Sequence, residues 1–325
     1  MKILAVDDDP YILEILAMMA ARVGFTDFST ALSGEIALDM LNKSDVVFDC
    51  LLLDINMPGM DGIELCKLVR TMPAYSKTPV IMLTAMAEKN YIDRAFQAGA
   101  TDYANKPFDI VELSARLGMA EEVVTARQEA AAAISTGGTH SPASANQHAF
   151  DISDEVLIEG VKDMIEYAAL GNYLTQLSRA GLVSSQVFAV KIGQIEAIYA
   201  RSSTEEFIYA LTEVADAIGD VMRSIGYMMA YAGNGAFVVI SNKATLEPSV
   251  SLEIEIQDSL DEKNSEYDNS DPLDIEIFIG NPIRPNTSKA QRIRRTFDRV
   301  IARAENRALK KRSEPRPVNI RLVGG

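Results

Sequence analysis

The first 110 residues alternate between short apolar runs and longer segments whose apolar residues recur every three or four positions. Short apolar runs are typical of strands buried on both faces, and the longer spacing is typical of amphipathic helices. Five such units predict an α/β fold, with a doubly wound sheet of five parallel strands. The expected strands are 2–6, 25–31, 49–53, 79–84 and 101–105, and the expected helices are 10–23, 34–42, 62–70, 88–98 and a long helix from 109.

A stretch rich in Ser, Thr, Gly and Pro at 135–149 has the composition of a linker. Beyond it we expect an α+β domain around an antiparallel hairpin, because two apolar runs flank the turn signal Asn234-Gly235. The expected helices are 154–180 (capped by Ser153), 205–225 and 289–311, and the expected strands are 187–192, 228–231, 237–240 and 275–279. The predicted domains are therefore 1–119 and 151–325, joined by a helical extension and flexible linker at 120–150.

Composition narrows the class of protein. The chain has 325 residues, of which 48% are hydrophobic, so it can bury a sizeable core in two domains. No run approaches the roughly 18 apolar residues of a membrane-spanning helix, and the start does not resemble a signal peptide, so we expect a cytoplasmic protein without membrane contact. Cys50 and Cys66 fit reduced core residues, while His140 and His148 fall in or beside the linker and are poor catalytic or zinc candidates.

Three carboxylates follow strands of the expected parallel sheet. Asp7 and Asp8 come directly after the first strand, and Asp54 ends the third. The carboxyl ends of parallel strands meet at one edge of a sheet, where ligands of open α/β folds bind. Carboxylates gathered there repel one another unless a cation joins them, and an all-oxygen cluster suits Mg²⁺.

A hydroxyl and an ammonium group end two further strands, at Thr84 and Lys106. With Mg²⁺, such a site can hold a phosphoryl group: Asp54 attacks in line while the two cations neutralise the equatorial oxygens. Each motif alone has an ordinary structural explanation, such as an acidic helix start or a Lys-Pro surface turn. Their joint occurrence in this order favours phosphoryl chemistry.

Four blocks resemble the signature motifs of the response regulator receiver domain across residues 1–119: Val6-Asp7-Asp8-Asp9-Pro10, Leu53-Asp54-Ile55-Asn56-Met57-Pro58, Leu83-Thr84-Ala85 and Tyr103-Ala104-Asn105-Lys106-Pro107-Phe108. The resemblance implies a flavodoxin-like fold in a bacterial two-component system. It also implies that Asp54 is the phosphoacceptor for a histidine kinase or phosphotransfer protein. The implied Mg²⁺ ligands are Asp7, Asp8, Asp54 and the main-chain carbonyl of Asn56.

The same resemblance implies a switch. Thr84 and Lys106 would contact the phosphoryl group, and Tyr103 would move into the space that Thr84 vacates. That movement would change the face formed by the fourth helix, fifth strand and fifth helix, which in this family often passes the signal on by homodimerisation.

The order of elements in residues 151–312 more faintly resembles the GGDEF domain of diguanylate cyclases. The residues that carry cyclase chemistry are missing, because Lys191 stands at the metal-binding aspartate position and the hairpin reads Ala232-Gly233-Asn234-Gly235-Ala236. The guanine-reading positions fall on Tyr199 and Ile208, and a phosphate-binding lysine is replaced by Glu305. Nucleotidyl transfer with two metal ions needs carboxylates. We therefore expect no enzyme here but a degenerate domain that signals to an unidentified protein through protein contacts.

Two alternatives stay open. Arg223 is the remnant of an inhibitory cyclic di-GMP site in the resembled family, so the second domain could be a cyclic di-GMP receptor or keep residual cyclase activity. The final expected helix is rich in arginine, and residues 281–325 carry 13 basic and 3 acidic side chains. A DNA-binding regulator is the weaker alternative, because the chain carries a net charge of −15 and no helix-turn-helix accompanies the basic helix.

Overall fold

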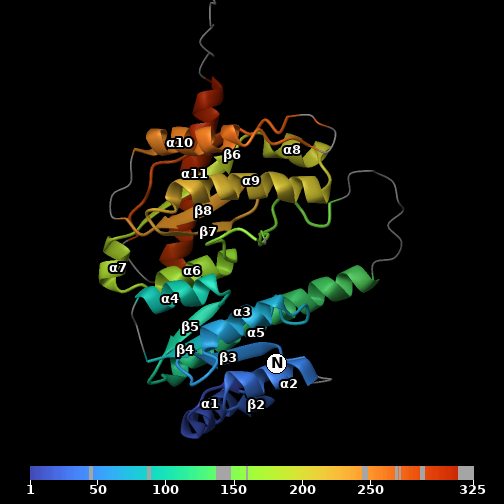
Figure 1. Cartoon of the computed structure of the whole chain (residues 1–325), viewed down its shortest axis with the longest axis vertical. Coiled ribbons are helices and arrows are strands. Elements are labelled where there is room, and N and C mark those ends of the chain that lie inside the picture. Colours follow the sequence, from blue (N-terminus) through green and yellow to red (C-terminus); the bar gives the residue numbers. More distant parts are fainter. Residues whose placement is uncertain are drawn as a thin grey trace, which may run out of the picture. The chain divides into compact units, whose positions relative to one another are not determined.

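The computed structural model describes residues 1–43, 47–85, 89–136, 148–158, 160–243, 248–267, 270, 272–285 and 290–313. It divides into two compact units (Figure 1). The first unit comprises Met1–Ala145, Ile165–Gly181 and Ser288–Ala290, and the second comprises Asn146–Met164, Leu182–Thr287 and Gln291–Gly325. Most of the predicted linker, including His140, lies outside the described residues.

The first unit contains a sheet of five parallel strands in the order β2-β1-β3-β4-β5. All residues of the three central strands are buried, as their continuous apolar runs predict. The strands are β1 (Ile3–Val6), β2 (Phe28–Ala31), β3 (Cys50–Asp54), β4 (Val80–Thr84) and β5 (Asp102–Asn105). The predicted five-stranded α/β sheet is confirmed.

The five predicted helices of this unit are present: α1 (Pro10–Arg22), α2 (Gly34–Lys43), α3 (Gly62–Thr71), α4 (Lys89–Gln97) and α5 (Ile110–Thr136). Local sequence marks where they begin. Asp9 caps α1 by accepting a hydrogen bond from the Tyr11 amide at 2.9 Å, and Pro10 occupies the first helical turn. Helices α1 and α5 pack against the same side of the sheet, where their apolar residues join those of β1, β3 and β4 in one core.

The second unit contains an antiparallel sheet of four strands in the order β7-β8-β6-β9. Its strands are β6 (Gln186–Ile192), β7 (Tyr227–Tyr231), β8 (Ala236–Ser241) and β9 (Ile277–Ile279). The predicted hairpin is present, and Asn234 at its tip has a φ of 51° between Gly233 (81°) and Gly235 (70°). The helices that lie wholly or mostly in the second unit are α8 (Ile195–Arg201), α9 (Thr204–Met222), α10 (Ser249–Glu262) and α11 (Ala290–Ser313).

The expected helix over 154–180 is wrong. The structure has two short helices instead, α6 (Tyr167–Gln176) and α7 (Arg179–Val183). Positive φ angles at Gly160 (82°) and Asp163 (59°) are incompatible with a continuous helix. Ser153 caps no helix; its hydroxyl donates to Asp151 Oδ1 at 2.6 Å.

Two helices of the second unit were not expected, α8 and α10. Helix α10 lies in the acidic segment, but Leu252, Ile256 and Leu260 recur every four residues and are buried. No helix in the described part of the chain is both long enough and apolar enough to cross a bilayer.

Candidate functional site

The site lies at the carboxyl ends of β1, β3 and β4. Val6 pairs with Leu53, so Asp7 and Asp54, the next residue of each strand segment, lie side by side. Asp7, Asp8 and Asp54 each offer a carboxylate oxygen, and these oxygens lie within 4.8 Å of one another. Asp7 and Asp54 are buried, whereas Asp8 is exposed. Within the described residues this is the one such group of three, and its all-oxygen donor set fits Mg²⁺.

The Lys106 ammonium joins two of these carboxylates. Its Nζ lies 2.6 Å from Asp7 Oδ2 and 2.8 Å from Asp54 Oδ1. Burial alone would lower the pKa of Lys106, but hydrogen bonds and attraction from the two aspartates outweigh it and hold the pKa above its usual value. Lys106 therefore supplies a permanent positive charge next to Asp54.

Burial also perturbs Asp54. It raises the pKa of this carboxyl, repulsion from Asp7 and Asp8 adds to the rise, and Lys106 opposes it. A carboxylate that is poorly solvated and crowded by like charges gains from any positive charge that comes near. The electrostatics of the site thus favour a divalent cation.

Thr84 and Tyr103 lie beside this cluster. Thr84 ends β4, and its carbonyl accepts a hydrogen bond from the Lys106 amide at 2.6 Å. Both Thr84 and Tyr103 are fully buried. Burial raises the pKa of Tyr103, and a hydrogen bond with the Thr84 side chain opposes the rise. The two proposed switch residues are therefore in contact, with the Tyr103 side chain turned inward.

The loop after β3 turns the chain back sharply, so that strand β3 ends at Asp54. Asp61 caps α3 by accepting a hydrogen bond from the Glu64 amide at 2.7 Å, and the Gly62 amide donates to the Ile55 carbonyl at 3.2 Å. A Cβ atom at Gly62 would lie 2.1 Å from the Asp54 carbonyl oxygen. Only glycine permits this close return of the chain, which leaves Asn56 exposed in the loop.

One residue that holds this loop was missed from sequence. Glu35 on α2 accepts a hydrogen bond from the Met60 amide at 3.0 Å through its Oε1 atom. Hydrogen bonds from its own amide, from Ser33 and from Met60 lower the pKa of Glu35. No local pattern could have found it, because the two residues lie 25 positions apart and only the fold brings them together.

The candidate positions of the second unit do not form a comparable site. Lys191 on β6 pairs with Ala236, and its ammonium donates to the Asn234 carbonyl in the hairpin turn. Arg223 is exposed at the end of α9 and pairs with Asp220 at 2.7 Å.

The remaining second-unit positions of the resembled cyclase family lie on α8, α9 and α11. The Tyr199 hydroxyl lies against the Phe150 carbonyl, Ile208 lies on α9 and is half-buried, and Glu305 is exposed on α11.

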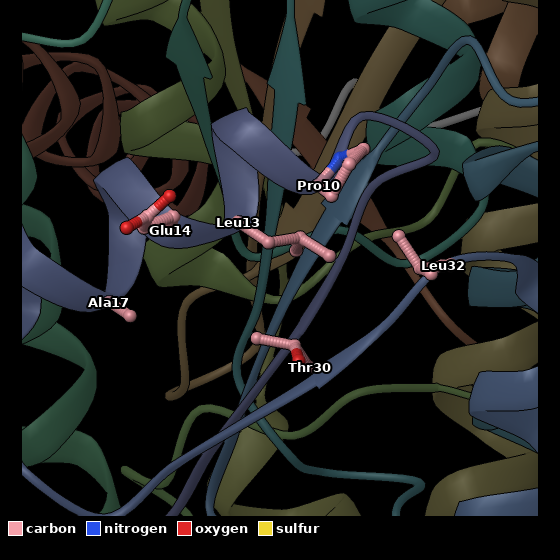
Figure 2. A pocket seen from close by; sticks show the side chains of 6 residues that line it. All are labelled: Pro10, Leu13, Glu14, Ala17, Thr30 and Leu32. Carbon is pink, nitrogen blue, oxygen red and sulfur yellow. The ribbon is translucent and has the colours of Figure 1, made fainter.

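An open hollow of about 290 Å³ lies between α1 and β2 (Figure 2). Its lining is mostly apolar and consists of Pro10, Leu13, Glu14, Ala17, Thr30 and Leu32. None of the predicted site residues lines it, and its polar lining residues are Glu14 and Thr30.

Comparisons with known proteins agree with this geometry. The family model of the response regulator receiver domain matches residues 3–118. The chain is 41% identical over 117 residues to the chemotaxis protein CheY-3 of Vibrio cholerae, which covers 36% of this chain and 88% of that protein. It is 43% identical over 108 residues to the chemotaxis protein CheY of Pseudomonas aeruginosa, covering 33% and 86%.

Among solved structures, the chemotaxis protein CheY4 of Vibrio cholerae is 34% identical and covers 37% of this chain and 97% of that chain, with a TM-score of 0.35. The family model falls on the unit that carries Asp7, Asp54 and Lys106. The chain therefore belongs to the response regulator family of two-component signalling, with its receiver domain at residues 3–118.

Proposed function

We propose that Asp54 accepts a phosphoryl group from a histidine kinase or a phosphotransfer protein, with Mg²⁺ bound by Asp7, Asp8, Asp54 and the carbonyl of Asn56. The observation that carries this proposal is the position of Lys106, which touches both Asp7 and Asp54. A carboxylate held by a lysine and crowded by two acids matches the needs of a phosphoryl acceptor.

Each side chain has a role in that transfer. Asp54 Oδ1 or Oδ2 forms the new P–O bond while the bond from phosphorus to the donor nitrogen breaks. Lys106 neutralises charge on the phosphoryl oxygens, and Thr84 offers its hydroxyl as a hydrogen-bond donor. A Mg²⁺ ion held by Asp7, Asp8, Asp54 and the Asn56 carbonyl would add further positive charge to stabilise the phosphoryl oxygens. The receiver thus takes up and loses a phosphoryl group and transforms no other substrate.

We further propose that the second unit is a degenerate GGDEF-like domain whose output is protein contact. Its order of elements, β6-α8-α9-β7-β8-α10-β9, with β6 and β8 in the middle of the sheet, fits a split β-α-β arrangement such as nucleotide cyclases use. Lys191 brings a positive charge to the hairpin turn, where a cyclase needs carboxylates for its metal ions.

The test of phosphorylation uses the full chain and acetyl phosphate with MgCl₂. We expect a mass increase of one phosphoryl group on the peptide that contains Asp54, its absence in Asp54→Asn, and its loss in EDTA. Labelling of Asp54→Asn at the same rate would refute the proposed acceptor. A parallel incubation with GTP and Mg²⁺ should yield no cyclic di-GMP, and formation of that product would refute the degenerate output domain.

A further inference from the structure

A tyrosine from beyond the linker packs into the first unit. Tyr173 on α6 is fully buried, and its ring meets Phe96 of α4 edge to face, with centroids 5.6 Å apart and planes at 82°. Phe96 is fully buried as well. This geometry is favourable for aromatic pairs and gives the contact between α4 and α6 an apolar centre.

Polar groups fix the same tyrosine in place. The Tyr173 hydroxyl donates to Asp93 Oδ1 at 2.8 Å, and Lys89 Nζ lies 2.7 Å from Asp93 Oδ2 and 3.1 Å from the Tyr173 oxygen. Burial, reinforced by the Asp93 charge, raises the pKa of Tyr173, so the phenol keeps its proton. A buried donor facing a charged acceptor makes one of the stronger protein hydrogen bonds.

Two further contacts extend beyond α4. Asn172 Nδ2 donates to the carbonyl of Thr101, immediately before β5, at 3.0 Å. Glu166, just before α6, pairs with Arg127 of α5 at 3.2 Å. The segment 166–173 therefore contacts α4, the start of β5 and α5 together.

We propose that α6 is a docking helix that the chain itself supplies to this face, and that its hold on the face is coupled to phosphorylation of Asp54. The proposal rests on the proposed function of Asp54. Two residues link the sites: Asn172 holds the start of β5, and Tyr103 on the same strand reaches Thr84 beside Asp54.

The hydrogen bond between Thr84 and Tyr103 sets the sign of the coupling. A phosphoryl oxygen on Asp54 is a charged acceptor and draws the Thr84 hydroxyl proton to itself. Because a hydroxyl donates and accepts at once, Tyr103 then donates to the Thr84 oxygen and stays inward. An inward Tyr103 is the arrangement found with α6 docked, whereas an outward ring would compete with α6 for the space over β5. Phosphorylation therefore strengthens docking, and docking favours phosphorylation by the same factor.

Hydrogen exchange of the full chain, read by mass spectrometry on peptides covering 165–178, tests the proposal. The samples are the protein alone, the protein with Mg²⁺ and beryllofluoride as a stable phosphoryl mimic, and Asp54→Ala with the same additions. We expect measurable protection of α6 in the unmodified protein. Beryllofluoride should slow its exchange about fivefold or more, and Asp54→Ala should show no such change.

Tyr173→Phe tests the contact itself. It keeps the ring on Phe96 but removes the bond to Asp93, which remains paired with Lys89. We expect exchange in 165–178 to be about tenfold faster. Tyr209→Phe is the matched control, because Tyr209 is 42% exposed on α9, and it should leave these peptides unchanged.

Each result decides one statement. No protection of α6, or no effect of Tyr173→Phe, overturns the docking. Protection that beryllofluoride leaves unchanged or weakens overturns the coupling. The phosphoryl adduct is measured with acetyl phosphate on the same preparation: if Asp54 takes no label, the proposed function and the coupling both fall, whereas a labelled Asp54 with unchanged exchange overturns the coupling alone.

Discussion

The Lys106 ammonium lies 2.8 Å from Asp54 Oδ1 and forms a second contact with Asp7 at 2.6 Å. Its side chain is 18% exposed, so solvent screens these contacts only partly. Without it, two buried carboxylates would face each other with no positive charge between them. The lysine thus stabilises the site before any metal ion or phosphoryl group arrives.

We expect Lys106→Met to lower the free energy of unfolding by about 2 kcal/mol in EDTA, because a charged hydrogen-bond donor is lost to buried acids. The loss should be smaller in MgCl₂, since the ion supplies positive charge to the same carboxylates. Urea denaturation in both buffers measures the difference. Lys43→Met is the control, because Lys43 is an exposed helix residue paired with Asp39. An equal loss in both buffers would contradict the shared role of lysine and cation.

Asp54→Asn should change how stability depends on pH. The pKa of Asp54 is raised in the folded protein, so the folded state keeps this proton to a higher pH than the unfolded chain does. Stability therefore falls as the pH rises from the ordinary carboxyl value, about 3.9, through the raised one. In EDTA we expect Asp54→Asn to be more stable than the natural chain at pH 7, with the gain vanishing below pH 4.

Denaturation midpoints in urea from pH 3 to pH 8 measure this effect. Asp39→Asn serves as the control, because Asp39 is exposed and should show no such pH-dependent gain. A gain for Asp54→Asn that persists unchanged at pH 3 would mean that ionisation of the carboxyl is not its cause.

Magnesium should stabilise the first unit through the same carboxylates. A ligand that binds only the folded state adds about 2.7 kcal/mol when its concentration is 100 times its Kd. We expect Asp8→Asn to remove most of this gain while changing stability little in EDTA, because Asp8 is exposed. Thermal denaturation with a MgCl₂ titration gives the comparison. A full magnesium response in the variant would exclude Asp8 as a ligand.

The hairpin turn of the second unit should not tolerate a side chain at Gly233. Its φ is 81°, and a Cβ atom would lie 2.2 Å from the Ser153 carbonyl oxygen. We expect Gly233→Ala to destabilise the second unit by about 2 kcal/mol or more, because both the backbone and the packing oppose it.

Gly118→Ala is the matched change for that experiment. Gly118 lies within α5, where a Cβ atom meets nothing within 4 Å. Alanine should raise stability there by up to about 1 kcal/mol. Hydrogen exchange of peptides from β7 and β8 separates the second unit from the first, and unchanged exchange in Gly233→Ala would contradict this account of the turn.

The strand ends at Asp54 and Thr84 could be predicted from sequence, because the central strands of a parallel sheet are buried on both faces and their residues are therefore almost all apolar. Continuous apolar runs define its central strands, and the end of each run fixes which side chain reaches the edge. The contact between Glu35 and Met60 could not be predicted, because nothing local to either residue specifies a partner so far along the chain.

Helix α6 shows a second limit of prediction from the sequence pattern. Its apolar spacing predicts a helix but does not say which unit covers it. Tyr173 finds Phe96 and Asp93 only once α4 has formed, and the positive φ angles at Gly160 and Asp163 separate α6 from the residues before it. A small or polar residue at such a break, such as Gly160 or Asp163, does not disturb the helical spacing of the apolar residues around it. The pattern alone therefore predicts a longer helix than the structure contains.

The chain enters the segment Ile165–Gly181 from the second unit and returns to the second unit after it. A helix tethered at both ends meets its binding face at a local concentration set by chain length, not by the amount of protein in solution. Dilution should therefore leave the attachment of α6 intact, while any dimer that used the same face would dissociate. An external protein could gain access only by outcompeting a ligand that never leaves the molecule.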